Sequence, residues 1–395
     1  MRKVRLAVVI SHPIQHFAPL YASLASEPAI TLKVFFLAEN GLGTYRDQQF
    51  ATDVAWDIPL TAGYDHQFVD PGRVIGKFNF FTMDSPNLLS AMHHFDPHVI
   101  WLHGYAQLAN WRVLFGSLGK RRIIYSSDSN LADSRARWRR LIKKLWVKVF
   151  FRRCDKFLSI SPTNRRYLQH YGVPEAKIVD SAFPIDMTRW QDDRARLTAG
   201  GRKQLAGSLN LPDGATVLLF IGKLIARKRP QDILQALAKL DRPRLVLVVV
   251  GSGEMHEELA VLAKKLGIED CVRFTGFINQ KHLAQYFDLA DIFVFPSENE
   301  PYGATAAESL PFGLPMVVAA GIGAIGASVI EGRNALLYRV GDTDHLTHQL
   351  KTLLDDTEMR SAFSSASLKL AQAHDKSLMA RDIISICKLY ATEST

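Results

Sequence analysis

Cysteine is scarce in this sequence. The 395 residues include three cysteines, Cys154, Cys271 and Cys387, which lie far apart and lack the spacing of metal ligands. An odd, scattered set of this kind indicates neither a disulfide framework nor a zinc site. We therefore expect no bound metal, no cofactor and a reducing compartment such as the cytoplasm.

Long apolar runs are absent as well. The run from Leu6 to Ile10 is too short for the apolar core of a signal peptide, and no run reaches the ~18 residues that a membrane-spanning helix needs. The sequence also contains no internal repeat and no low-complexity tract. Its hydrophobic content of 47% allows a large core, and its length is typical of two domains.

Acidic residues are in the minority, with 39 Asp and Glu against 48 Lys and Arg, a net charge of +9. This balance indicates an anionic partner: substrate phosphates, acidic lipid headgroups or nucleic acid. No nucleic-acid recognition motif accompanies the charge, so we expect no nucleic-acid partner.

Short Val/Ile/Leu-rich runs alternate with amphipathic segments along the whole chain. This alternation predicts parallel sheets covered on both faces, and therefore two doubly wound α/β domains of the Rossmann type. Apolar periodicity lapses in "QDDRARLTAGGRKQLAG". We expect an N-terminal domain at 1–195, a C-terminal domain at 196–375, and a helix at 376–395 that packs back toward the N-terminal domain.

Ligands of such sheets bind beyond the carboxyl ends of the strands. The segment "FVFPSENEPYGATAAESLPFGLPMVVAA" places Glu300 and Glu308 after one predicted strand, on either side of a turn at Gly303 and the start of a helix. A helix N-terminus binds phosphate, and carboxylates accept hydrogen bonds from hydroxyls. Together they describe a sugar-nucleotide site. Taken singly, either glutamate is more simply a solvated acid on a surface helix.

The same segment resembles the signature of the retaining GT-B glycosyltransferases of family 4. "GKLIARKRP" is similar to the Gly-Arg-Leu and Lys-Gly element of that family, and the resemblance covers about residues 215–355. It implies the GT-B fold, two Rossmann-like domains facing across a cleft. It also implies an NDP-sugar donor, held mainly by the second domain, and transfer without an obligatory metal.

The resemblance further implies roles for individual residues. Catalytic roles fall to His103, Glu300, Lys228 and Lys223, the two lysines neutralising the donor diphosphate. Donor binding falls to Glu308, Gly303, Ala304, Tyr302, Thr305, Gly276, Phe277, Gly222 and Gly251. His12 and His16, in a "SHPIQ" loop typical of a bacterial subgroup, are expected on the acceptor side. A lone histidine after a strand is otherwise more often structural than catalytic.

The chain departs from the family pattern at two places. Arg229 stands where glycine is usual, and Ala327 stands where a later element usually has glutamate. Some donor contacts of the family are therefore not expected here.

Residues 135–156, "RARWRRLIKKLWVKVFFRRCDK", predict a basic amphipathic helix. Its apolar stripe can pack against the sheet of the first domain, or the helix can lie on an anionic membrane. Both can hold, with the stripe inward and the basic residues toward lipid. The membrane alternative would give the protein a peripheral position on the inner face of the cell membrane.

We expect a retaining, metal-independent hexosyltransferase that moves a sugar from UDP- or GDP-sugar to a glycan or lipid-linked acceptor in bacterial surface polysaccharide or glycolipid synthesis. Two alternatives stay open: a GT-B sugar-nucleotide epimerase, and a non-catalytic membrane-associated assembly protein. Retention of both Lys228 and Glu308 argues against the second.

Overall fold

The computed structural model describes residues 3–47, 52–116, 118, 121–131 and 137–392. The chain divides into two compact units. Unit 1 comprises residues 1–44, 58–186 and 375–395, and unit 2 comprises residues 45–57 and 187–374.

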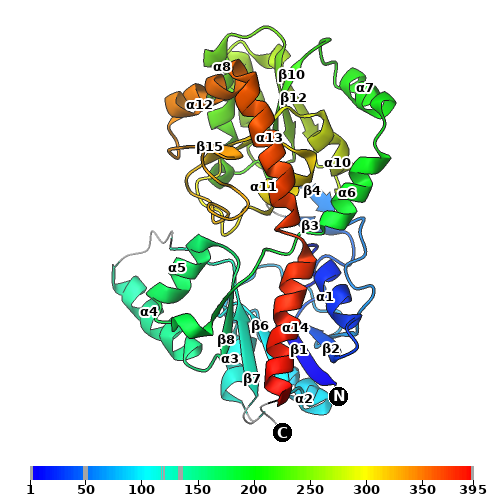
Figure 1. Cartoon of the computed structure of the whole chain (residues 1–395), viewed down its shortest axis with the longest axis vertical. Coiled ribbons are helices and arrows are strands. Elements are labelled where there is room, and N and C mark those ends of the chain that lie inside the picture. The colour runs from blue at the N-terminus through cyan, green and yellow to red at the C-terminus, as the bar shows by residue number, and fades with distance from the viewer. Residues whose placement is uncertain (1–2, 48–51, 117, 119–120, 132–136, 393–395) are drawn as a thin grey trace. The chain divides into compact units, whose positions relative to one another are not determined.

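Unit 1 is built on a parallel sheet with seven strands in the described part of the chain (Figure 1). Their order is β5 (His66–Phe68), β2 (Ile30–Phe36), β1 (Val4–Ile10), β6 (Val99–His103), β7 (Arg122–Ser126), β8 (Lys156–Ser159) and β9 (Ile178–Asp180). The helices are α1 (Ala18–Ala25), α2 (Asn87–Phe95), α3 (Leu108–Phe115), α4 (Arg137–Phe151), α5 (Pro162–His170), the short η1 (Glu175–Lys177) and α14 (Lys376–Thr392).

Unit 2 contains a second parallel sheet, with six strands among the described residues. Their order is β12 (Val272–Gly276), β11 (Leu245–Val250), β10 (Thr216–Ile221), β13 (Ile292–Phe295), β14 (Met316–Ala319) and β15 (Ala335–Tyr338). An antiparallel hairpin, β3 (Tyr45–Asp47) and β4 (Thr52–Val54), also belongs to this unit. The helices are α6 (Met187–Arg196), α7 (Ala199–Ser208), η2 (Ala226–Lys228), α8 (Pro230–Leu240), α9 (His256–Lys265), η3 (Glu269–Cys271), α10 (Gln280–Leu289), α11 (Ala304–Glu308), η4 (Leu310–Phe312), α12 (Thr343–Asp355) and α13 (Thr357–Gln372).

Both sheets follow from near-continuous apolar strands. Strands β10 and β11 pair in parallel from Thr216 with Leu245 to Ile221 with Val250, and their apolar side chains are buried. A strand buried on both faces needs apolar residues at successive positions rather than at alternate ones. This architecture confirms the predicted α/β class with two Rossmann-like domains.

The contact-defined units differ in detail from the expected domain limits. The hairpin at 45–57 belongs to unit 2. Helix α6 also belongs to unit 2, although it ends close to the expected boundary at 195. Trp190 of α6 explains the second difference, because its buried ring meets Phe287 and Phe312 of unit 2. Helix α14 lies in unit 1 against α1.

Helix α4 does not bury the apolar stripe that its sequence suggested. Val147, Phe150 and Phe151 pack into the core of unit 1, whereas Leu141 and Leu145 are 68% and 69% exposed. The inward orientation of the stripe is therefore wrong for the middle of the helix, because the aromatic C-terminal turn sets which face is buried. Residues 135–136 and the side chains of 137–140 lie outside the described part.

No helix among the described residues combines the length and the hydropathy that crossing a bilayer requires.

Candidate active site

The carboxyl edge of the unit 2 sheet gathers most of the residues singled out in the sequence. Strand β10 is the point at which the strand order reverses, with β11 and β12 on one side and β13 to β15 on the other. In doubly wound sheets the crevice outside such a switch point binds the ligand. Lys223 follows β10 and Glu300 follows β13, so the two flank this point.

Glu300 is the centre of a buried ion-pair cluster. Its Oε1 lies 2.6 Å from Nζ of Lys228 and 2.5 Å from a guanidinium nitrogen of Arg227. Burial lowers the pKa of Lys228, while the neighbouring Glu300 acts in the opposite direction. Sequence reasoning brought Lys228 and Glu300 together but missed Arg227 as a partner of the glutamate.

Lys223 has a partner that the sequence did not indicate. Its ammonium group donates to both carboxylate oxygens of Asp47, at 3.2 and 3.0 Å. Asp47 lies on the hairpin, which the amide of Asn279 anchors through the carbonyl of Ala55. Because 176 positions separate Lys223 from Asp47, no local pattern reveals this pair.

Three predicted glycines lie at the ends of adjacent strands. A side chain on Gly251 would place its Cβ 1.9 Å from the carbonyl oxygen of Gly222, so the backbones touch directly. The amide of Gly251 also donates to the carbonyl of Gly276 at 2.9 Å. Next to them, the ring of Phe277 meets Trp56 of the hairpin edge to face. This corner offers glycine backbone and a half-buried aromatic ring at one end of the edge.

The turn before α11 has the left-handed conformation that favours glycine. Gly303 has φ of 101°, and a Cβ there would lie 3.0 Å from Phe295 and 3.3 Å from Ile322. Ala304 and Thr305 follow it in the first turn of the five-residue α11 and are half-buried. Tyr302 is buried, and its hydroxyl donates to Ser328 at 3.4 Å, so its side chain braces the turn.

Glu308 is buried at the end of α11. Burial raises its pKa to about 7, and the positive charge of Arg189 opposes that rise. The guanidinium of Arg189 stacks on Trp190 at 4.0 Å and donates to Gln280 at 2.9 Å, which fixes its position.

A glycine-rich loop after β14, absent from the sequence expectations, fixes the backbone on both sides of Glu300. Cβ atoms on Gly321 and Gly323 would lie 1.9 and 1.7 Å from the carbonyl oxygens of Glu298 and Pro301. The amide of Gly323 donates to the carbonyl of Glu300 at 3.0 Å. Only glycine permits this approach, so the loop orients the glutamate through its backbone.

The structure explains one departure from the family pattern. Arg229, at a position where glycine is usual, has the left-handed φ of 50°. Its guanidinium is held by the buried carboxylate of Asp232 at 2.7 Å, which offsets the strain. Ala327 continues the glycine-rich loop, where its amide donates to the carbonyl of Ala324.

His103 lies at the end of β6 in unit 1 and is buried. Its Nε2 is 3.0 Å from the hydroxyl of Tyr21, and its Nδ1 is 3.5 Å from Oγ of Ser126. Burial lowers its pKa to about 3, so the ring is neutral at physiological pH. Phe17 packs its ring at 4.6 Å from that of His103.

The two expected acceptor-side histidines follow β1 in unit 1. Nδ1 of His12 is 2.9 Å from Oγ of Ser11, and burial lowers its pKa to about 4. The ring of His16 meets Phe183 edge to face at 5.4 Å. The strand ends of unit 1 thus present ring-packed histidines, of which His12 and His103 have lowered pKa values, in contrast to the charged edge of unit 2.

Two protein-family models match the chain. The model described as glycosyl transferases group 1 matches residues 201–370, and the model described as Glycosyltransferase Family 4 matches residues 44–180. Among sequence relatives, a D-inositol 3-phosphate glycosyltransferase from Thermomonospora curvata is 33% identical over 219 residues, 53% of this chain and 50% of that protein. A D-inositol 3-phosphate glycosyltransferase 2 from Catenulispora acidiphila is 35% identical over 190 residues, 45% of this chain and 44% of that protein. The chain spans about half the length of the curated relatives it matches.

Solved structures resemble the chain over nearly its whole length. Sucrose-phosphate synthase from Thermosynechococcus elongatus has a TM-score of 0.77 at 18% identity and covers 99% of this chain and 100% of its own. Anabaena HepE in complex with UDP has a TM-score of 0.73 at 16% identity, with 98% of this chain and 99% of its own covered. WaaG, a glycosyltransferase involved in lipopolysaccharide biosynthesis, has a TM-score of 0.68 at 15% identity. The match covers 97% of this chain and 99% of the WaaG chain. At these identities the likeness shows the fold. The chain thus has the GT-B fold, and a glycosyltransferase family model matches part of each half of the chain.

Proposed function

We propose that the protein is a retaining glycosyltransferase that moves a sugar from an NDP-sugar to a hydroxyl group of a glycan or lipid-linked acceptor. The observation that carries the proposal is the order of groups along the carboxyl edge of the unit 2 sheet. Glycine backbone and Phe277 lie at the ends of β11 and β12, the cations Lys223 and Lys228 follow β10, and Glu300 follows β13. This order matches the base, the diphosphate and the sugar of an extended sugar nucleotide.

The diphosphate would displace carboxylates from the cations. In the structure Lys223 is paired with Asp47, and Lys228 with Glu300. A diphosphate brings more negative charge than either carboxylate and accepts several charge-assisted hydrogen bonds at once. Arg227 can keep its bond to Glu300 when Lys228 turns to phosphate, so the glutamate stays paired during binding. These cations favour a reaction that does not depend on a metal.

The two glutamates would hold hydroxyl groups. We assign Glu300 to the transferred sugar, because it adjoins the cations, and Glu308 to the nucleotide ribose. With a pKa raised to about 7, Glu308 is protonated in part at neutral pH and can then donate as well as accept.

In the proposed reaction the bond between the anomeric carbon and the diphosphate oxygen breaks as the acceptor hydroxyl forms the new glycosidic bond from the same face, and the hydroxyl proton passes to the departing diphosphate oxygen. Negative charge that develops on the departing diphosphate is stabilised by Lys223 and Lys228, and one well-placed donor of this kind contributes about 3 to 4 kcal/mol. A neutral His103 would position groups by hydrogen bonding rather than supply a proton as an acid, because its pKa is lowered to about 3.

UDP is the favoured nucleotide in this proposal, with GDP as the second choice. Structures of HepE with UDP and with UDP-glucose share the fold of this chain. The sequence relatives are named for transfer to D-inositol 3-phosphate, which supports a hydroxyl acceptor but not its identity.

Incubation of the purified protein with a panel of UDP- and GDP-sugars, with and without simple glycoside acceptors, tests the proposal. We expect slow release of the nucleoside diphosphate and, with a suitable acceptor, a product that keeps the anomeric configuration of the donor. An epimerised sugar nucleotide as the main product would favour the epimerase. No turnover with any donor would favour the non-catalytic assembly protein.

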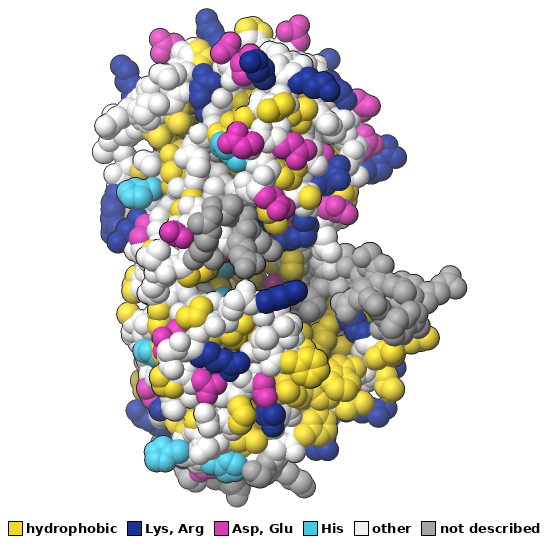
Figure 2. Space-filling model, turned by 180° about the vertical axis from the view of Figure 1, so that it is seen from behind, with side chains coloured by type: hydrophobic (Ala, Val, Ile, Leu, Met, Phe, Trp, Pro, Cys, Tyr) yellow, Lys and Arg dark blue, Asp and Glu magenta, His cyan; other side chains and the backbone are white. Residues whose placement is uncertain are grey.

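We further propose that the acceptor is presented at an anionic membrane surface. The supporting feature is an apolar face of unit 1, made of Phe81, Phe115, Leu141, Ile142, Leu145 and Trp146, all exposed. Ring contacts connect it: Trp146 packs at 4.1 Å on Trp111, which stacks on Phe115. Figure 2 shows hydrophobic side chains gathered on the surface of this unit. Soluble monomers rarely expose a contiguous apolar patch of this kind without a function.

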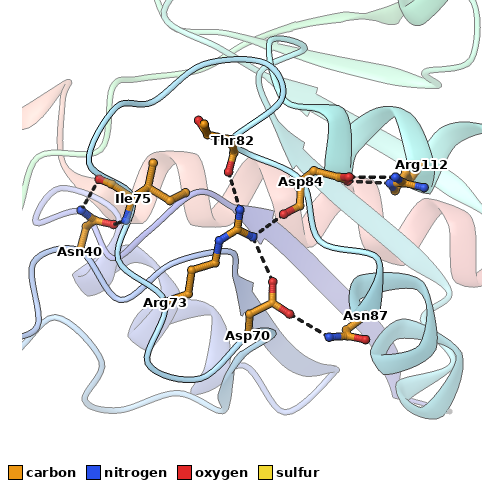
Figure 3. A network of polar contacts seen from close by, with 8 residues as sticks. All are labelled: Asn40, Asp70, Arg73, Ile75, Thr82, Asp84, Asn87 and Arg112. Carbon is orange, nitrogen blue, oxygen red and sulfur yellow. Dashed lines mark hydrogen bonds and ion pairs between the residues drawn. The ribbon is translucent and has the colours of Figure 1, made fainter.

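The loop that carries Phe81 is fixed by polar contacts (Figure 3). Arg73 donates to Asp70 at 3.0 Å and to the carbonyl of Thr82 at 2.7 Å. Arg112 donates two hydrogen bonds to the carboxylate of Asp84, at 2.6 and 2.8 Å. The 75% exposure of Phe81 is therefore built into the fold. On α4, lysines at positions 143, 144 and 148 alternate in sequence with the exposed apolar residues and are half-buried. The ammonium group of Lys143 lies over the rings of Tyr167 and Tyr171, so Lys144 and Lys148 are the better placed to meet acidic headgroups.

A further inference from the structure

Unit 1 contains a cavity of about 530 Å³, whose lining includes none of the histidines His12, His16 and His103. It is lined by Ile100, Val113, Leu114, Leu118, Arg121, Arg122, Ile123, Arg152, Arg153 and Asp155. Ile100 and Arg122 lie at the beginnings of β6 and β7, whereas His103 and Ser126 end the same strands. The cavity is therefore at the amino edge of the sheet, the opposite edge from the histidine site.

Positive charge dominates the lining. Four arginines face a single lining carboxylate, Asp155. That carboxylate is already engaged, because it accepts from the backbone amide of Ile123 at 2.8 Å and from Arg122 at 3.3 Å. The C-terminal ends of α3 and α4 are near, but each contributes only roughly half a negative charge. Asp96, outside the lining, pairs with Arg121 at 2.6 Å, so the excess of positive charge in the cavity comes from Arg152 and Arg153.

Three of the four arginines, Arg121, Arg122 and Arg153, have contacts that hold their guanidinium groups in place, so little order would have to be created there on binding. Arg121 donates to Asp96 at 2.6 Å, and its buried Nε has no hydrogen-bond partner among the described residues. The guanidinium of Arg122 lies 4.9 Å from the ring centre of Tyr390, and that of Arg153 lies 4.9 Å from the ring centre of Phe115. Preorganised guanidinium groups bind phosphate with paired hydrogen bonds.

The rest of the lining is apolar. Ile100, Val113, Leu118 and Ile123 are buried side chains that line the same space. The volume falls within the range of small-molecule sites, which combine an apolar lining with a few convergent polar groups. A bare inorganic ion would leave this apolar part without a contact.

We propose that this arginine cavity binds a phosphate group that is attached to a small apolar body. Two sources provide that chemistry: a soluble phosphorylated metabolite and the headgroup of a phospholipid. The proposal does not depend on the sugar-transfer function, because it rests on residues at the other edge of the unit 1 sheet.

Isothermal titration of the full-length protein with two probes distinguishes the sources. Phenyl phosphate, which carries its phosphate on a small apolar body, represents the soluble ligand, and dihexanoyl phosphatidic acid, kept below its micelle concentration, represents the lipid. We expect at least one probe to bind the wild type. If the short-chain lipid binds about tenfold more tightly than the soluble probe, the ligand is a phospholipid. If the two affinities are similar, the ligand is a soluble metabolite.

The double variant Arg152→Gln/Arg153→Gln locates the binding. Both residues follow the last turn of α4, so their replacement should leave the thermal unfolding midpoint close to that of the wild type. We expect binding about tenfold weaker or lost. The matched control is Lys264→Gln/Lys265→Gln, which removes the same charge from exposed positions of α9 in unit 2 and should stay within about twofold of the wild type.

Three outcomes overturn the proposal. The first is that neither probe binds the wild type. The second is that the arginine variant binds as tightly as the wild type. The third is that both double variants weaken binding equally, because the effect would then be one of overall charge.

Discussion

The ammonium group of Lys228 lies 2.6 Å from Oε1 of Glu300, and both side chains are largely withdrawn from solvent. A buried pair of this kind is costly to break from one side, because the remaining charge loses its partner. Here Arg227 provides a second partner for the glutamate, 2.5 Å away. Lys228 is therefore able to leave Glu300 for a phosphate.

Lys228→Ala should lower turnover by about two orders of magnitude or more, because one well-placed cation at the departing diphosphate contributes about 3 kcal/mol. Arg227 still pairs Glu300, so the fold should persist. Steady-state kinetics with the best donor measures the loss. Arg227→Gln, at a more exposed position, is the control and should lose less. Near wild-type turnover in Lys228→Ala would remove this residue from the diphosphate site.

Asp47→Asn should tighten nucleoside diphosphate binding by about two- to tenfold, the equivalent of a weak to moderate ion pair. The reason is competition, since the carboxylate of Asp47 pairs with Lys223 at 3.0 Å and a diphosphate would have to replace it. The control is Asp53→Asn on the neighbouring strand, where the carboxylate is exposed and should not matter. Calorimetric titration measures the affinity of both variants for the nucleoside diphosphate. Weaker binding in Asp47→Asn would show that Asp47 helps rather than competes.

Glu308→Gln should change how stability depends on pH. Because burial raises the pKa of Glu308 from 4.5 to about 7, the native state holds its proton more tightly than the unfolded chain. Its stabilising contribution is complete below pH about 4.5 and is lost as pH rises through 7. The loss amounts to about 3 kcal/mol.

Urea unfolding between pH 4.5 and 8 measures this effect. The variant should gain stability relative to the wild type as pH rises over that window. Parallel stability curves would contradict the raised pKa.

Gly303→Ala should destabilise unit 2 by about 1 to 3 kcal/mol, because the residue has a positive φ and its new methyl group would press on Phe295. Gly332→Ala is the control: its φ of 68° is also left-handed, but nothing lies within 4 Å of the added carbon. Gly332→Ala should lower the free energy of unfolding by about 1 kcal/mol, because it carries only the cost of a left-handed backbone conformation and no steric clash. Equal losses of unfolding free energy in the two variants would mean that the turn at Gly303 is not tightly packed.

Leu141→Gln/Leu145→Gln should weaken sedimentation with anionic vesicles at least about fivefold, since the two side chains are exposed and would enter the lipid interface. Val261→Gln, 67% exposed on α9 of unit 2, is the control and should sediment like the wild type. Salt should release the wild type, because the Debye length falls to ~3 Å at 1 M. If the leucine variant sediments as the wild type does, the apolar face is not a membrane contact.

Local sequence predicted which residues meet at the carboxyl edge of the unit 2 sheet, for a physical reason. Strands of a parallel sheet end at one edge, so Lys223, Gly251 and Glu300, each just after an apolar run, had to lie near one another. The partners of these residues could not be predicted in the same way. Asp47 comes from a distant hairpin, and the need for glycine at 321 and 323 arises from a backbone packed against them.

Helix α4 illustrates a second limit. Its periodicity indicated an apolar face, but tertiary packing of Phe150 and Phe151 decided which side chains are buried. A pattern gives the spacing of apolar residues along a helix, and the neighbouring elements determine which of them find a partner.

Calorimetric titration of the wild type with UDP and GDP, alongside uridine and guanosine, tests the central claim most directly. The claim is that the unit 2 edge binds a nucleoside diphosphate through Lys223 and Lys228. We predict that at least one diphosphate binds with a micromolar Kd, and that the matching nucleoside binds at least about tenfold more weakly, because a nucleoside brings no charge to the lysines. Binding of neither diphosphate, or equal affinity for nucleoside and diphosphate, would contradict the account.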